Sequence, residues 1–157
     1  DLASAGRLDR FLAGILSPEN DLFERALAAL GVPEAHRARA AASPTTRAFG
    51  DFLVRIGLER PFEDVLTALY VTEGSYLDWA SRLVEAGKRP ENPLYREWIR
   101  IHGPEALGDF VGWLRSFLDS ADLATNRARL EDVFVTALRY EYLFWEAACR
   151  GVAWPEG

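Results

Sequence analysis

The sequence predicts an all-α helical bundle, and three observations lead to this prediction. Apolar residues recur at intervals of three and four along most of the chain, no segment alternates between apolar and polar residues as a strand does, and the connections between the periodic segments are short. The chain has 157 residues, 49% of them hydrophobic, so it can bury a sizeable core. We therefore expect a single all-α domain over residues 1–157.

The first part of the chain predicts two helices separated by a tight turn. The segment ENDLFERALAALG (19–31) has its leucines and phenylalanine near helical spacing, and Gly31 suits the position just after a helix. Pro33 can then open a short helix through EAHRARAA (34–41), because its fixed φ suits the first helical turn.

A capped helix and a long helix are predicted in the middle of the chain. Ser43 offers an N-cap, and Pro44 occupies the first helical position. Four apolar residues fall on one face of this helix: Ala48, Phe49, Phe52 and Ile56. The next periodic segment runs from about Pro61 to Ala86 and is closed by Gly87. At 1.5 Å per residue it is roughly 40 Å long.

Three further helices are predicted toward the C-terminus. NPLYREWIRIHG is a short helix capped by Asn92, and GPEALGDFVGWLRSFLDSA follows it. TNRARLEDVFVTALRYEYLFWEAACRG is a second long helix that ends at Gly151. The region of Asn92 and the segment SADLATNR (120–127) are expected to be turns.

Composition and charge exclude several classes of partner. The net charge is −6 and the basic residues are scattered, so neither nucleic acid nor an anionic membrane surface is an expected partner. No apolar run approaches the roughly 20 residues that a membrane-spanning helix needs. The single cysteine cannot form an internal disulfide, and the opening residues lack the pattern of a signal peptide. We therefore expect a cytoplasmic protein.

Two glutamates lie at the centres of apolar helix faces. On a helical wheel, the residues within about 60° of Glu73 are Leu66, Leu69, Tyr76, Leu77 and Ala80. The residues within about 60° of Glu141 are Leu130, Phe134, Ala137, Phe144, Trp145 and Ala148. Both long helices therefore place one acid among apolar and aromatic side chains.

Such an acid costs several kcal/mol if it stays ionised and unpaired, so its pKa should rise or it must find donors. If the two helices face each other, Glu73 and Glu141 share a dry, aromatic-lined space that suits general acid–base chemistry on a small polar molecule. Tyr76, one turn beyond Glu73, can supply a hydroxyl that orients a carboxylate or a ligand.

The alternative is that each glutamate pairs with an arginine inside the fold. The available arginines are Arg55, Arg82, Arg96 and Arg139. For either acid alone the two interpretations are equally good, whereas two acids at the same wheel position in the two longest helices favour a functional pair.

Metal and cofactor sites have little support in the residues. A diiron carboxylate bundle requires Glu-x-x-His on two helices. The histidines are His36 and His102, and neither is preceded by glutamate at that spacing. A lone histidine leaves haem ligation open, but a surface histidine is the commoner case, and no glycine-rich phosphate loop is present. We expect no metal and no cofactor.

Four segments resemble the TenA/thiaminase II family. RYEYLFWEAACRG resembles its closing helix, whose pattern is roughly Tyr-Glu-Tyr-x-Phe-Trp, and ALYVTEGSYLDWASRL resembles its central helix. SPTTRAFGDFL and NPLYREWIRIHGPEALGDFVGWL resemble two further segments, in the same order and spacing. The resemblance covers nearly all of this chain but about the last two-thirds of a typical member. Because the chain also lacks methionine, we expect it to be part of a longer protein, with the family's N-terminal helices and their pyrimidine-reading aspartate outside it.

The resemblance implies a haem-oxygenase-like helical bundle that forms a homo-oligomer, a tetramer or a dimer. It also implies a hydrolase that acts on thiamin-degradation pyrimidines, aminomethyl- or formylaminomethyl-pyrimidine, in thiamin salvage. Glu141 stands where the family has its acid/base glutamate, and Tyr76 matches the tyrosine of the central helix. Thr72 stands where one branch has a nucleophilic cysteine. EGSY resembles a second branch with Glu-x-x-Tyr, in which Glu73 is the acid.

The resemblance also assigns two substrate-binding rings. Phe49 and His102 stand where the cysteine branch has tyrosines, and both keep a flat ring that can stack on a pyrimidine. In this interpretation Glu141 protonates or holds the leaving amine, while Glu73 orients or activates water or grips the pyrimidine.

Two other functions stay open. A non-catalytic ligand-binding or regulatory protein could use the same scaffold, because the cysteine is missing and two ring positions differ. An oxidase of the same fold would typically use a metal, a redox cofactor or the electrons of its own substrate, and the scarcity of histidines disfavours it.

Overall fold

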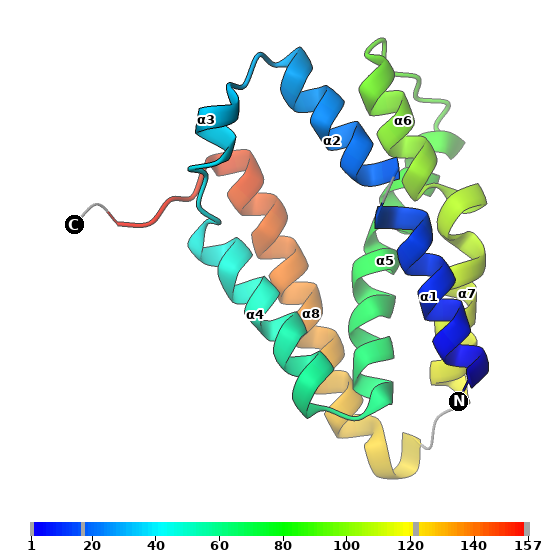
Figure 1. Ribbon diagram of the computed structural model, residues 1–157. Coiled ribbons are helices and arrows are strands. Elements are labelled where there is room, and N and C mark those ends of the chain that lie inside the picture. Colours follow the sequence, from blue (N-terminus) through cyan, green and yellow to red (C-terminus); the bar gives the residue numbers. More distant parts are fainter. Residues whose placement is uncertain (1, 17, 121–122, 156–157) are drawn as a thin grey trace. The chain divides into compact units, whose positions relative to one another are not determined.

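The computed structural model describes residues 2–16, 18–120 and 123–155, and it consists of helices joined by short connections (Figure 1). The helices are α1 (Leu2–Leu16), α2 (Pro18–Ala29), α3 (Glu34–Arg37), α4 (Pro44–Glu59), α5 (Phe62–Glu85), α6 (Pro93–His102), α7 (Pro104–Asp119) and α8 (Leu123–Arg150). No strand occurs in these ranges, so the all-α prediction is confirmed. None of the helices described is long and apolar enough to cross a membrane.

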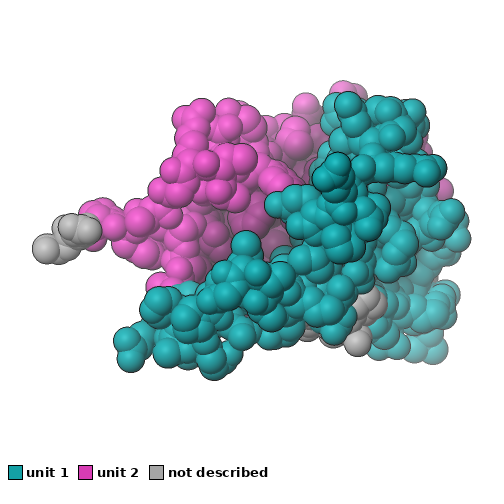
Figure 2. Space-filling view, turned by 90° about the horizontal axis from the view of Figure 1, so that it is seen from above, with its two compact units in different colours: residues 1–40, 79–110 teal, residues 41–78, 111–157 magenta. Residues whose placement is uncertain are grey.

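The chain divides into two compact units, each made from two separate stretches of sequence (Figure 2). Unit 1 contains residues 1–40 and 79–110, and unit 2 contains residues 41–78 and 111–157. Helices α5 and α7 each contribute residues to both units. The single domain over residues 1–157 stays a prediction.

In unit 2, α4 and α8 run antiparallel, side by side (Figure 1). Ile56 of α4 and Val133 of α8 are buried together with Ala68 of α5. The partly buried side chains that pack around these three are Phe52, Leu53 and Val65. The apolar face predicted for the helix after Ser43 is therefore the face that meets α8.

The predicted cap and stop residues agree with the structure. Ser43 Oγ accepts a hydrogen bond from the Thr46 N–H at 3.1 Å, and Asn92 Oδ1 accepts one from the Leu94 N–H at 2.9 Å. The three predicted stop residues have positive φ angles, the backbone conformation in which glycine is favoured: Gly31, Gly87 and Gly151.

The structure differs from the predicted elements at three places. Helix α1 was not predicted, because Gly6 and Gly14 lower its intrinsic helix propensity. Helix α3 ends at Arg37. The chain continues as turns in which a backbone N–H donates to the carbonyl oxygen three residues earlier. The turn predicted over 120–127 is wrong from Leu123 onward, where α8 already begins, and residues 121–122 lie outside the described ranges.

In unit 1, tertiary contacts explain why α1 forms in spite of its glycines. The ring of Phe11 on α1 stacks on Phe110 of α7, with centroids 3.8 Å apart and ring planes within 5° of each other. Helix α2 packs against both α1 and α6. Aromatic stacking and helix packing thus outweigh a weak local preference.

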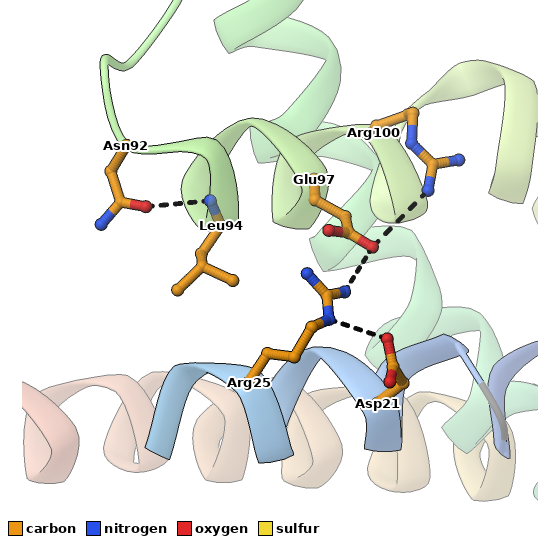
Figure 3. A network of polar contacts seen from close by, with 6 residues as sticks. All are labelled: Asp21, Arg25, Asn92, Leu94, Glu97 and Arg100. Atoms are coloured by element: carbon orange, nitrogen blue, oxygen red, sulfur yellow. Dashed lines mark hydrogen bonds and ion pairs between the residues drawn. The ribbon is translucent and has the colours of Figure 1, made fainter. Parts of the chain in front are cut away.

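A polar network links α2 to α6 (Figure 3). Arg25 of α2 donates to Asp21, one turn earlier, and to Glu97 of α6, both at 2.8 Å. Arg100 lies 4.0 Å from the same Glu97 oxygen. The Arg25 guanidinium lowers the pKa of Glu97. Because the network is solvent-accessible, it fixes how α2 meets α6 more than it adds stability.

A buried ion pair anchors the start of α5 to α8 in unit 2. The side chain of Asp64, in the first turn of α5, is fully buried, and Arg129 of α8 pairs with it. The N-terminal end of a helix also favours a carboxylate. Removing the arginine would leave a buried charge without its cation.

We predict that Arg129→Leu lowers the free energy of unfolding by about 3–5 kcal/mol, the range found when one partner of a buried ion pair is removed. Urea denaturation followed by circular dichroism measures this change. The matched control is Arg127→Leu, on the same helix. The Arg127 side chain is 79% exposed and lies 3.9 Å from Glu131, so the control should change stability by no more than about 0.5 kcal/mol. Equal losses in the two variants would contradict the assignment.

Candidate functional site

Unit 2 contains a cavity of about 370 Å³ between α4, α5 and α8. The residues that line it are Phe49, Leu53, Ile56, Val65, Ala68, Leu69, Thr72, Glu73, Tyr76, Glu141 and Phe144. Most of the lining is apolar or aromatic, and the two predicted glutamates are its acids. A volume of this size suits a small heteroaromatic molecule.

Glu141 is placed on this cavity by α8. The residue is only 5% exposed, although it is a glutamate. The Trp145 indole, one helical turn later, is hydrogen-bonded to its carboxylate. Its Oε2 atom has no hydrogen-bond partner among the described residues. A buried oxygen of this kind is costly to the fold, and a protonated carboxyl reduces that cost.

Burial raises the pKa of Glu141 to about 7, and the neighbouring charge of Glu73 contributes to the increase. The hydrogen bond from Trp145 acts in the opposite direction, because it favours the ionised form. At neutral pH the Glu141 carboxyl is therefore divided between its protonated and ionised forms, so it can both donate and accept a proton.

Glu73 reaches the same cavity from α5, but its surroundings differ. The residue is partly buried, so the predicted burial of both acids is correct for Glu141 and only partial for Glu73. The Thr72 hydroxyl lies 3.4 Å from Glu73 Oε1 and 3.2 Å from the Leu69 carbonyl oxygen. The two acids share one cavity in different degrees of contact with water, and such a difference separates the roles of acid and base.

Aromatic side chains form the walls around the acids. Phe49 of α4 is buried and stacks on Tyr140 of α8, with centroids 5.5 Å apart and planes within 8° of each other. Phe144 is tilted against Phe49 at 6.4 Å. Tyr76 of α5 packs against Trp145 at 5.6 Å. Flat rings on several sides can hold a planar ligand.

The apolar face predicted for α8 is only partly buried. Leu130 and Ala137 are buried with Glu141, whereas Phe134 and Trp145 keep 37% and 36% of their surface exposed. A wheel gives the direction in which a side chain leaves its helix, but not how much of the neighbouring chain covers it.

Two of the four arginines considered as partners for the glutamates are engaged elsewhere. Arg55 binds Glu59 at 2.9 Å, and Arg96 donates to the carbonyl oxygens of Pro90 and Glu91. No arginine contributes to the raised pKa of Glu141. The arginine-pairing alternative is therefore not supported for Glu141.

The remaining predicted residue, His102, belongs to unit 1. It is buried, its Nδ1 lies 2.9 Å from the Trp98 carbonyl oxygen, and its Nε2 lies 3.6 Å from Glu19 Oε1. Its ring packs on Trp98 and Trp79, with centroids 4.4 and 5.8 Å away. Its role in substrate binding stays a prediction.

Sequence reasoning did not assign three residues to the site. The helical wheel places Trp145 on the same face as Glu141 without giving it a role, and in the structure it contacts both Glu141 and Tyr76. Phe144 lines the cavity beside Phe49, and Tyr140 supports Phe49 by stacking on its ring. The signal was present in the spacing, because residues 144 and 145 lie three and four positions after Glu141 and therefore share its face.

Among the described residues, no group of three His, Cys, Asp or Glu side chains could hold a metal ion. The cavity itself offers two carboxyl groups, hydroxyls and aromatic rings.

Comparisons with known proteins show similarity to one family. The family model described as TENA/THI-4/PQQC matches residues 1–151. A Halalkalibacterium halodurans protein named aminopyrimidine aminohydrolase is 24% identical over 98% of this chain and 70% of its own length. Proteins of the same name from Helicobacter pylori and Bacillus subtilis are 25% and 28% identical. They match 85% and 99% of this chain and 63% and 66% of their own lengths. The chain thus spans about two-thirds of these relatives.

We predict that Glu141→Gln stabilises the protein at high pH and much less at low pH. The pKa of Glu141 is about 7 in the folded protein and near its ordinary value of 4.5 in the unfolded chain. Between these values the folded state binds more protons, so its stability falls as pH rises through that window. Glutamine avoids this loss, so the advantage of the variant should grow by roughly 2–4 kcal/mol from pH 4.5 to pH 8.

Urea denaturation at the two pH values measures this advantage. Glu131→Gln is the matched control, because Glu131 is an exposed glutamate on the same helix. The gain in stability at high pH should be specific to Glu141→Gln. A constant difference between Glu141→Gln and the unsubstituted protein would show that Glu141 titrates normally.

We predict that substitutions of the two neighbours shift the pKa of Glu141 in opposite directions. Glu73→Gln removes a nearby charge and should lower it, although burial keeps it above 4.5. Trp145→Phe keeps an aromatic ring but removes the indole donor, and should raise it. Carbon-13 NMR titration of glutamate carboxyl groups, with Glu141 assigned through Glu141→Gln, measures both shifts. Shifts of the same sign would refute this account of the site.

Proposed function

The chain belongs to the TENA/THI-4/PQQC family, and from this premise we propose that the protein hydrolyses an aminopyrimidine. The family assignment confirms the predicted resemblance to the family, whereas the branch with a glutamate in place of the cysteine stays a prediction. The all-α structure agrees with the haem-oxygenase-like fold of the family. The relatives named aminopyrimidine aminohydrolase support the substrate class and the reaction.

The observation that carries the proposal is that Glu73 and Glu141 meet at one ring-lined cavity. Hydrolysis of a carbon–nitrogen bond needs a proton for the departing amine and a base for the attacking water. A carboxyl with a pKa of about 7 can supply the proton near neutral pH. A second carboxylate with better access to water can take a proton from the nucleophile.

In the proposed reaction, the bond between the pyrimidine-bearing carbon and the amine nitrogen breaks while a bond from that carbon to water oxygen forms. Glu141 gives its proton to the leaving nitrogen. Glu73 takes a proton from the attacking water, and that proton returns to Glu141 through solvent to restore the starting state. The products are the hydroxymethylpyrimidine and ammonia, or formamide in place of ammonia when the substrate is the formylaminomethyl compound. Each acid–base contribution is typically about 10²–10⁴-fold.

The finer assignments belong to the same proposal. Thr72 replaces the thiol of the cysteine branch, and its hydroxyl supports Glu73 rather than attacking the substrate. Tyr76 and Phe49 line the cavity and offer rings to the pyrimidine. Aminomethyl- and formylaminomethyl-pyrimidines, taken up in thiamin salvage, are the proposed substrates. The homo-oligomer, and the part played by His102, remain expectations from the family.

We predict that Glu141→Gln and Glu73→Gln each lower kcat of the full-length protein by about 10²–10⁴-fold, because each removes one proton-transfer group. The measurement is release of hydroxymethylpyrimidine from the aminomethyl compound, followed by liquid chromatography. Glu131→Gln, on the exposed side of α8, should leave kcat unchanged.

Turnover unaffected by both substitutions would refute the assigned roles. Tight binding of hydroxymethylpyrimidine by the unsubstituted protein, without turnover of the aminomethyl or the formylaminomethyl compound, would refute the hydrolase proposal. That result would instead identify a ligand-binding protein on this scaffold.

A further inference from the structure

A second cavity, in unit 1, gathers four basic side chains. It has a volume of about 640 Å³ and lies among the end of α5, the connection that follows, α6 and the start of α7. The basic residues on its lining are Lys88, Arg89, Arg96 and Arg100, and Glu105 is the acid among the described residues that line it. We propose that this cavity binds a small molecule through a phosphate group that the molecule carries.

The turn after α5 brings the first two cations to the cavity. Gly87 has a φ of 64°, the Lys88 N–H donates to the Leu83 carbonyl oxygen at 2.9 Å, and the Gly87 N–H donates to that of Val84 at 3.0 Å. These two bonds form a Schellman motif, which ends a helix and redirects the chain. The backbone itself therefore determines where Lys88 and Arg89 leave the helix.

Arg96 fastens this connection to α6. Its Nη1 donates to the carbonyl oxygens of Pro90 and Glu91 at 2.7 and 2.6 Å. Carbonyl oxygens orient the guanidinium without neutralising it, and the remaining N–H groups of the fork stay available to another acceptor. Arg100 lies one turn further along the same face of α6.

The charges on this lining are poorly compensated. Lys88 and Arg89 have no ion-pair partner among the described residues. Arg100 is 4.0 Å from Glu97, but Arg25 already binds that carboxylate at 2.8 Å (Figure 3). Four cations thus meet a single acid here, although the whole chain has a net charge of −6. Such a local excess of one sign attracts a ligand of the opposite sign.

A phosphate group fits this chemistry better than a carboxylate does. It carries up to two negative charges and three acceptor oxygens, which match two guanidinium forks and a lysine. The first turn of α7, opened by Pro104, adds a favourable dipole at the rim. The cavity is larger than a phosphate ion, and Val84, Pro90 and Ile99 offer apolar surface to the organic part of the ligand.

The cavity shares no lining residue with the one that contains Glu73 and Glu141. Phosphate binding at this cavity therefore does not depend on the proposed hydrolysis, and it can be measured without turnover.

Isothermal titration calorimetry of the full-length protein with ribose 5-phosphate, ribose and inorganic phosphate at constant ionic strength tests the proposal. We expect saturable binding of the ester and of phosphate, and none of ribose. The double substitution Arg89→Gln with Arg100→Gln should weaken binding at least about tenfold. Arg96→Lys keeps the charge but loses the fork, and should weaken it to a smaller extent.

The matched control removes two arginines from exposed ion pairs elsewhere, Arg115→Gln with Arg127→Gln. It has the same net charge as the test variant and should bind phosphate as tightly as the unsubstituted protein. Equal weakening in both double variants would show a general charge effect and overturn the proposal. Absence of phosphate binding would overturn the proposal as well. In a further titration with heparin, binding of heparin but not of phosphate would also overturn it, in favour of a polyanionic macromolecule as the ligand.

Discussion

The burial of the Glu141 carboxyl is the constraint on which unit 2 depends. Helix α8 must place one face against α4, and that face includes an acid that is 5% exposed. A side chain such as leucine would fill this position at lower cost, because a buried oxygen without a partner destabilises a fold. The surrounding packing of Ile56, Ala68 and Val133 offsets the cost. Natural proteins depart from the rules of polar burial mainly at functional positions, and the buried Glu141 carboxyl does so at the cavity.

The two acids of the cavity are useful because they are unlike each other. Glu141, on α8, is buried and hydrogen-bonded to Trp145. Glu73, on α5, is only partly buried and lies beside the Thr72 hydroxyl. Proximity of like charges and unequal burial both separate proton affinities. The buried pair of Asp64 and Arg129 joins the start of α5 to α8, so the helices that supply the two acids are tied together near one end.

Unit 1 uses charge differently. The ion pairs of Arg25 lie at the surface between α2 and α6, where they orient the two helices (Figure 3). The excess cations of unit 1 collect around the turn that follows α5. Along the sequence the basic residues are scattered. A net charge of −6 over the whole chain does not exclude a local cluster of basic residues in the folded protein. Folding brings Lys88 and Arg89 near Arg96 and Arg100 because a left-handed glycine and a carbonyl-binding arginine shape the connection.

The sequence by itself determined the helices from α2 to α8, the caps at Ser43 and Asn92, the family, and the two acids at the centres of the long helices. These features follow from the recurrence of apolar residues every 3.6 positions and from the hydrogen bonds of helix caps, both of which act over a few residues. Only the tertiary structure decided that Glu141 is buried and Glu73 partly open, that Trp145 hydrogen-bonds the acid, and that α1 forms at all. The physical reason is that burial and pKa depend on what distant segments cover, which no local pattern contains.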